Sequence, residues 1–167
     1  GKMIVLDNAT AQVAKADWGI KLKKADDDEK KDDKKDDKNI YVDVKRYENR
    51  ERDAVVNNIP GAIYKVELDN SHPLAFGYDN NYYSLKQSGD MYEFMKDGWN
   101  VGIIKKENQT SGFVGSVTRE KIKDGTVMGV LPMGSGAVVF FAGDPIFRNF
   151  WENGKMLLAN AVFLVGQ

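Results

Sequence analysis

The sequence contains no cysteine and only one histidine, His72, among its 167 residues. Without cysteine, the chain cannot form a disulfide, a thiolate nucleophile or a Cys-ligated metal site. The single histidine has no second imidazole to complete a zinc shell, and Ala75 stands where an HxxE pair would place glutamate. We therefore expect no metal ligands and no cysteine chemistry in this chain.

The sequence also lacks an excess of charge of either sign and any long hydrophobic run. It has 24 basic and 25 acidic residues, a balance that argues against an electrostatic nucleic-acid binder. No apolar run reaches the roughly 20 residues needed to span a bilayer, and no signal peptide opens the chain. Because 42% of the residues are hydrophobic, the length suits one globular domain with a real core.

One segment, residues 21–39, holds 16 charged residues in 19, eight lysines and eight acids. Its lysine and aspartate pairs repeat every four residues, so Lys30 faces Lys34 and a helix would place like charges together. With nothing apolar to dock, the segment is predicted to be a charged disordered insertion within the domain. A weak calcium site and a docking tail are the alternatives, and Asp26, Asp27 and Asp28 lack the alternate spacing and the glycine of an EF-hand loop.

The remaining chain alternates strand and helix patterns, with more strand than a simple βαβ repeat would give. Residues 3–7 form a short apolar strand, and Asn8 or Thr10 can cap a helix that carries Val13, Ala14 and Trp18. A surface helix is expected over 41–57. Over 155–164 we expect a buried helix that is apolar on nearly all sides and packs against the sheet or another subunit. Further strands are expected near 62–68, 82–85, 101–105, 113–117, 126–131 and 137–141.

Few residues in these patterns carry chemistry. His72 follows a strand and precedes Pro73 and a glycine turn, a position that can line a pocket at the end of a sheet. Asp144 can cap a turn that begins at Pro145, and Arg148 can either pair with Asp144 or bind an anion. We therefore take His72, Asp144 and Arg148 as candidate ligand-binding residues, and we name no catalytic residue and no metal ligand.

Ser135 lies between Gly134 and Gly136, half of the GxSxG pattern of a nucleophile elbow. The flanking spacing does not match that motif, and a tight hairpin between two strands explains both glycines. The same stretch lacks the third glycine of a dinucleotide-binding loop. The sequence therefore predicts a hairpin at this place.

Several short motifs, in order along the chain, carry a resemblance to one family. They are IPGAIY at 59–64, HPLAFGY at 72–78, GFVG at 112–115, MGSG at 133–136, FFAGDP at 140–145, FRNFW at 147–151 and LANA at 158–161. Together they resemble the C-terminal accessory domain of bacterial zinc carboxypeptidases of the carboxypeptidase A-like class. That domain is similar to class I glutamine amidotransferases. The resemblance implies an α/β fold, a flavodoxin-like sheet with flanking helices that is incomplete at its N-terminus.

The resemblance also implies that hydrolysis belongs to a separate upstream domain, which carries the zinc and its HxxE…H ligands. An amidotransferase needs a cysteine nucleophile and a histidine–glutamate pair, and this chain has neither. We therefore expect a non-catalytic accessory or interaction domain of a secreted or periplasmic zinc metallocarboxypeptidase-like protein. Its partners would be the upstream peptidase domain and, through an exposed sheet edge, a second copy of the chain.

Two other functions remain open at this point. The chain can be an independent ligand-binding module that uses His72, Asp144 and Arg148 to hold a small anion or a sugar. It can also be a hydrolase that uses Ser135 or an acid and a water molecule.

Overall fold

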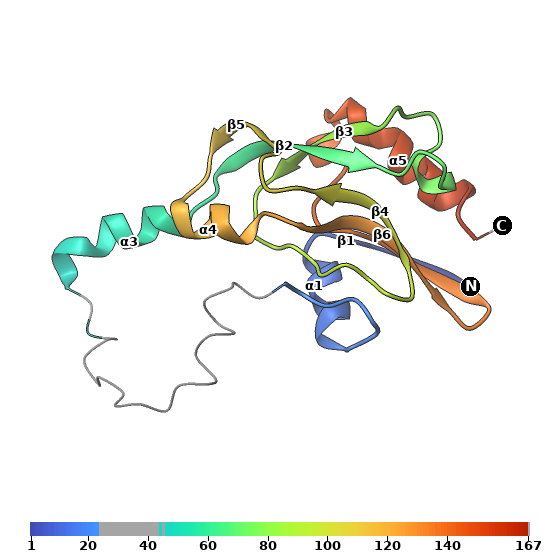
Figure 1. Cartoon of the computed structure of the whole chain (residues 1–167), viewed down its shortest axis with the longest axis horizontal. Helices are drawn as coiled ribbons and strands as arrows, with labels where there is room; N and C mark the ends of the chain where they lie inside the picture. Colours follow the sequence, from blue (N-terminus) through green and yellow to red (C-terminus); the bar gives the residue numbers. More distant parts are fainter. Residues whose placement is uncertain (24–43, 45, 167) are drawn as a thin grey trace.

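The computed structural model of the protein describes residues 1–23, 44 and 46–166 (Figure 1). The charged insertion predicted at 21–39 therefore lies outside the described residues, apart from its first three. The described parts form a mixed α/β structure with one seven-stranded sheet and flanking helices. This much of the predicted fold class is confirmed.

The sheet has the strand order β1-β7-β6-β4-β2-β3, and β5 also pairs with β2. Only β1 and β7 run parallel, whereas the other described strand pairs are antiparallel. The strands are β1 (Lys2–Leu6), β2 (Gly61–Leu68), β3 (Asn81–Lys86), β4 (Trp99–Ile104), β5 (Gln109–Phe113), β6 (Gly125–Met133) and β7 (Gly136–Phe141).

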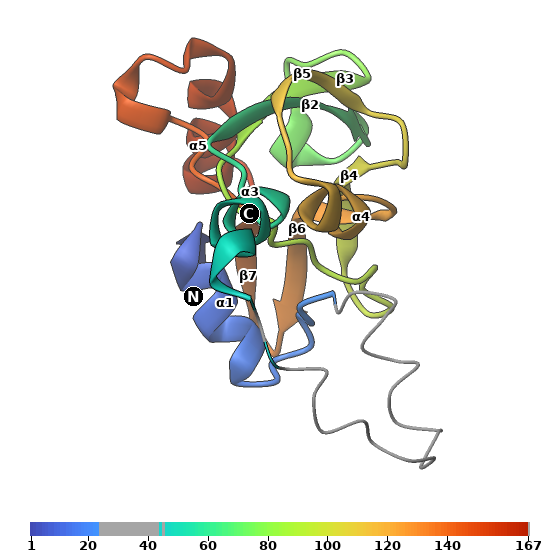
Figure 2. The ribbon, with the colours of Figure 1, turned by 90° about the vertical axis from the view of Figure 1, so that its left-hand side faces the viewer.

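The helices lie around this sheet, and two of them matter for the sites described below. Helix α1 (Asn8–Lys15) follows β1 directly, and α5 (Glu152–Phe163) closes the described chain. The shorter helices are α3 (Arg50–Val56) and α4 (Ser116–Lys121), with 3-10 turns η1 (Tyr47–Asn49), η2 (Pro73–Ala75) and η3 (Phe147–Asn149). Figure 2 shows α1 below α5 on the same side of the view.

Helix α5 connects the two ends of the sheet. At its first turn, the Trp151 indole N–H and the Asn153 amide both donate to the carbonyl of Tyr83 on β3. At its last turn, the Lys2 ammonium group on β1 donates to the carbonyls of Val162 and Val165. The sheet is therefore curved enough for one 12-residue helix to reach both of its outer strands.

The first turn of α5 fits closely on the loop after β7. Gly154 is buried, and a Cβ placed there would come to 1.7 Å from the carbonyl oxygen of Pro145. No real Cβ approaches an oxygen so closely, so this position needs glycine. The close approach fixes the loop that carries Asp144 against the helix.

Most of the strands and helices predicted from the sequence are confirmed. Burial alternates strictly along β2, as the apolar alternation of 62–68 predicts, and β6 and β7 form the predicted hairpin with Gly134 at φ +55°. The surface helix predicted over 41–57 is present as η1 and α3, while residues 41–43 and 45 lie outside the described part.

Three details of the prediction were wrong. The strand expected at 113–117 ends at Phe113 as β5, and α4 begins at Ser116. Helix α1 ends at Lys15, so Trp18 lies in the following turn and is exposed. The helix expected to be buried, α5, is only partly so in this chain, because Met156, Val162 and Phe163 face outward. Only one side of α5 enters the core, through Leu157 and Ala161.

Candidate functional site

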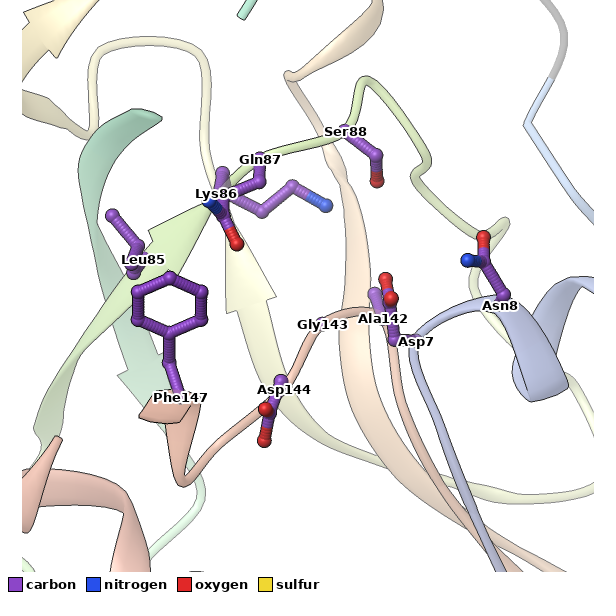
Figure 3. A pocket seen from close by; sticks show the side chains of 10 residues that line it. All are labelled: Asp7, Asn8, Leu85, Lys86, Gln87, Ser88, Ala142, Gly143, Asp144 and Phe147. Atoms are coloured by element: carbon purple, nitrogen blue, oxygen red, sulfur yellow. The ribbon is translucent and has the colours of Figure 1, made fainter. Parts of the chain in front are cut away.

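A cavity of about 260 Å³ lies where β1, β7 and β3 end (Figure 3). We call it the strand-end cavity. Its walls come from the turn after β1, the end of β3 and the loop after β7. The lining residues are Asp7, Asn8, Leu85, Lys86, Gln87, Ser88, Ala142, Gly143, Asp144 and Phe147. Ligands of open α/β sheets bind outside the carboxyl ends of the parallel strands, which is where this cavity lies.

Asp7 lies on a sharp strand-to-helix turn between β1 and α1. Its backbone has φ 48° and ψ −122°, a conformation that non-glycine residues rarely adopt. Its N–H donates to the carbonyl of Phe141, and its own carbonyl accepts from the N–H of Thr10. The Thr10 hydroxyl donates to the same Phe141 carbonyl at 2.7 Å, which holds the turn against β7.

The Asp7 carboxylate makes no capping hydrogen bond to α1, although aspartate is among the best N-cap residues. Within the described residues it has neither a hydrogen-bond partner nor an ion-pair partner. A strained backbone thus presents an exposed carboxylate to the cavity. Strain of this kind costs about 1–3 kcal/mol and concentrates at functional sites.

Lys86 is the charged side chain on the opposite wall, and it is only 1% exposed. Its ammonium group donates to the carbonyl of Asp90 at 2.5 Å, and no carboxylate of the described residues lies within ion-pair distance. Burial lowers the pKa of Lys86 from 10.5 to about 8, and the charges of Asp90 and Asp7 oppose this shift. This hydrogen bond engages one of the three N–H groups of the ammonium.

A buried hydroxyl group lies near the same charges. Tyr92 is fully buried, and its hydroxyl has no hydrogen-bond partner within the described residues. Burial raises its pKa, and the carboxylates of Asp90 and Asp7 raise it further. The carboxylates that act on Lys86 therefore also act on Tyr92.

Asp144 lies in the loop after β7 and is exposed. One of its carboxylate oxygens accepts from the N–H of Ile146 at 2.9 Å, so Asp144 caps the turn at Pro145 as predicted. Arg148 does not pair with Asp144. Its guanidinium group lies 5.1 Å from the centre of the Phe147 ring, and its backbone has φ 50°. The second carboxylate oxygen of Asp144 has no partner among the described residues.

His72 lies elsewhere, at the start of η2. Its Nδ1 accepts from the N–H of Leu74 at 3.0 Å, and Pro73 occupies the first position of the turn. Its ring lies 6.1 Å from that of Trp99, and burial lowers its pKa. This is the structural role that the sequence indicated beside the binding role.

His72 also borders an open hollow of about 520 Å³ between η2 and the end of α5. Phe76 and Phe163 border it as well, and they are 67% and 66% exposed. We call this region the Phe76 surface. Its lining residues are Asn70, Ser71, His72, Pro73, Phe76, Phe163 and Leu164.

The structure does not bring the three predicted ligand residues into one cavity. His72 lines the Phe76 surface, Asp144 lines the strand-end cavity, and Arg148 lines neither of the two. Ser135 lies at the tip of the β6–β7 hairpin, in neither region. A nucleophile elbow, the motif for which Ser135 was considered, is a sharp turn from a strand to a helix. The structure has a turn of this kind at Asp7.

The comparisons with known proteins give no relative. No family model, no curated protein and no solved structure matches the chain. Within the part of the chain that the structure describes, no helix has the length and hydropathy to cross a membrane. In the same residues, no three His, Asp or Glu side chains lie together in a group that would hold a metal ion.

Sequence reasoning missed Asp7 and Lys86. A signal for Lys86 was present, because a period of two from Tyr82 through Ser84 places residue 86 on the inward side of β3. Asp7 could be recognised only as the end of a strand followed by a helix. The positive φ that makes it unusual depends on how β1 and α1 pack against β7.

Proposed function

We propose that this chain is a non-catalytic accessory domain of a zinc metallocarboxypeptidase-like protein. In this proposal, peptide hydrolysis and zinc belong to an upstream domain of the same polypeptide, secreted or periplasmic, and this domain packs against it. The fold would be of the flavodoxin-like or class I amidotransferase-like kind. Its parallel part would be β1 and β7, with α1 following β1 through the Asp7 turn. The motifs from IPGAIY to LANA support this assignment.

The observation that carries the interaction role is the Phe76 surface. Large aromatic side chains that stay two-thirds exposed beside a hollow are typical of sites where another protein binds. Trp99, next to His72, is 58% exposed and extends the apolar area.

The position of the first residues favours an upstream domain as the occupant. Lys2 donates to the carbonyls of Val162 and Val165, so the start of the chain lies beside the end of α5. Figure 1 shows N and C at the same end of the molecule. A domain joined ahead of Gly1 would therefore emerge next to Phe163 and Leu164. β1, an outer strand among those described, begins at that end too and is the candidate contact for a second copy.

The test is zinc-dependent release of C-terminal residues from peptides, measured on the complete reading frame and on this chain alone. We expect activity in the complete protein and none in this chain. Within the complete protein, Phe76→Asp should change kcat/KM or lower the Tm of the peptidase domain. Phe113→Asp, a half-exposed aromatic on β5 at the far end of the molecule, is the matched control and should change neither.

Two results would contradict the proposal. One is a complete reading frame without zinc peptidase activity. The other is turnover by this chain alone, which would make the domain itself a hydrolase. Turnover that survived Ser135→Ala but not Asp144→Asn would then assign the reaction to an acid and a water molecule.

A further inference from the structure

The strand-end cavity is lined by charged side chains of both signs. Asp7 and Asp144 supply carboxylates from the turn after β1 and the loop after β7, and Lys86 supplies a buried ammonium group from β3. None of the three belongs to an ion pair among the described residues. A ligand with only one charge would satisfy one part of this cavity and be repelled by the other.

The negatively charged side of the cavity has two carboxylates with oxygens that make no hydrogen bond within the described residues. Asp7 has a strained backbone conformation, and its side chain does not cap α1. Asp144 uses one oxygen for the N–H of Ile146 and retains the other. Both side chains appear on the cavity wall in Figure 3, on either side of Gly143. An ammonium group offers the three N–H donors that two such carboxylates can accept.

Lys86 forms the positively charged side of the cavity. The Lys86 ammonium group is fixed by the carbonyl of Asp90, and in Figure 3 it extends over the space bordered by Ser88, Asn8 and Asp7. A carboxylate placed there would accept from its remaining N–H groups in a charge-assisted bond. The hydroxyl of Ser88 and the amides of Asn8 and Gln87 line the same space.

We propose that the strand-end cavity binds a free α-amino acid, whose ammonium group lies against Asp7 and Asp144 and whose carboxylate lies on Lys86. A volume of about 260 Å³ is smaller than the roughly 300–1,000 Å³ of drug-sized sites and suits a single small metabolite. Leu85 and Phe147 give the cavity an apolar side for the ligand's side chain. The inference depends on the cavity alone and does not require the accessory role.

The experiment is a titration of the ¹⁵N-labelled chain with glycine and with L-leucine, followed by amide shifts and calorimetry. We expect saturable shifts at Asp7, Lys86 and Ser88. Two analogues of leucine each keep only one of its two charged groups. 3-Methylbutylamine lacks the carboxylate, and 4-methylpentanoate lacks the ammonium group. Each should bind at least about tenfold more weakly than leucine, because each leaves one charged side of the cavity unsatisfied.

Variants then assign the contacts. Asp7→Asn, Asp144→Asn and Lys86→Met should each weaken leucine binding by about tenfold or more. Lys86→Met should have little effect on 3-methylbutylamine. Asp79→Asn and Lys106→Met, exposed charges outside the cavity, are the matched controls and should bind as the wild type does. The shift pattern of each variant shows whether it is folded.

Three results would overturn the inference. The first is no shift with either amino acid at about 10 mM, ten times a millimolar Kd. The second is binding of the amine or the acid as tight as that of leucine, which would make this a site for one charge only. The third is leucine binding that Asp7→Asn and Lys86→Met leave unchanged.

Discussion

The strand-end cavity and the Phe76 surface differ in every property that decides what binds. The cavity is small, lined by charges, and formed by three segments that the sheet brings together. The Phe76 surface is twice as large, open and mainly apolar, and it comes from one turn and one helix end. The first has the character of a site for a small charged ligand, and the second that of a contact with another protein. If both proposals hold, the chain has two separate binding regions that take different kinds of ligand.

The largest expected effect is in helix α5, which extends from one region to the other. Helix α5 carries Phe163 at one end, and its first turn packs against the loop of Asp144. Gly154→Ala would drive a Cβ into the Pro145 carbonyl and should lower the free energy of unfolding by about 3 kcal/mol. Both regions should lose their function together, as denaturant unfolding and the two binding assays would show.

The matched glycine for this comparison is Gly134, whose Cβ position is open but whose φ is +55°. Gly134→Ala should cost only about 1 kcal/mol, from backbone conformation alone. If the two substitutions destabilised the protein equally, the close packing of α5 on the Asp144 loop would not be its structural anchor.

Lys86→Met should stabilise the protein at pH 7 by about 2 kcal/mol. A pKa lowered from 10.5 to about 8 corresponds to roughly 3 kcal/mol of penalty for the buried charge, from which about 1 kcal/mol is subtracted for the lost bond to Asp90. The measurement is urea unfolding of both proteins.

The lowered pKa of Lys86 also predicts how the stability of the wild type changes with pH. Between pH 8 and 10.5 the unfolded lysine keeps a proton that the folded Lys86 has released, so stability rises with pH in this window. Below pH 8 both states are protonated and the penalty is complete. The stability gained by Lys86→Met should therefore shrink from pH 7 to 9.5, with Asp7 and Asp90 as the charged groups that act on Lys86. A gain that stayed constant with pH would mean that Lys86 titrates normally.

Asp7→Gly should raise the free energy of unfolding by about 1 kcal/mol, because glycine adopts φ 48° and ψ −122° without strain. The same substitution should abolish leucine binding in the cavity. Asp7→Asn keeps the strain and should be neutral in stability while it also weakens binding. Thermal unfolding separates the two variants. If Asp7→Gly were destabilising, the turn would not store strain for a functional side chain.

The smallest expected effect concerns the Phe76 surface in the isolated chain. Phe76→Asp and Phe113→Asp both replace exposed rings and should each change stability by no more than about 0.5 kcal/mol. A loss of several kcal/mol on Phe76→Asp alone would show that this ring belongs to the core of the domain.

The sequence was sufficient for features that depend on local pattern. The alternation of apolar and polar residues from Ala62 to Leu68 predicted β2, and the glycines on either side of Ser135 predicted the β6–β7 hairpin. The position of Asp144 before Pro145 predicted that it caps the turn there. Local pattern failed at Phe113, where a glycine-rich apolar stretch continued into a helix from Ser116.

The strand-end cavity could not be predicted in this way. Asp7, Lys86 and Asp144 are separated by 79 and 58 positions in the sequence, and they meet only because the outer strands β1 and β3 approach each other below α5. The sequence therefore indicated Asp144 but grouped it with His72 and Arg148, which lie at η2 and η3 and do not line this cavity.

The most direct test of the accessory role is to titrate the ¹⁵N-labelled chain with the proposed upstream peptidase domain, produced separately. We predict that amide shifts concentrate at Phe76, Phe163 and Leu164, and that the Asp7 and Lys86 amides stay unchanged. Shifts confined to the strand-end cavity, or no shifts at all, would contradict the claim that the Phe76 surface is where this domain meets its partner.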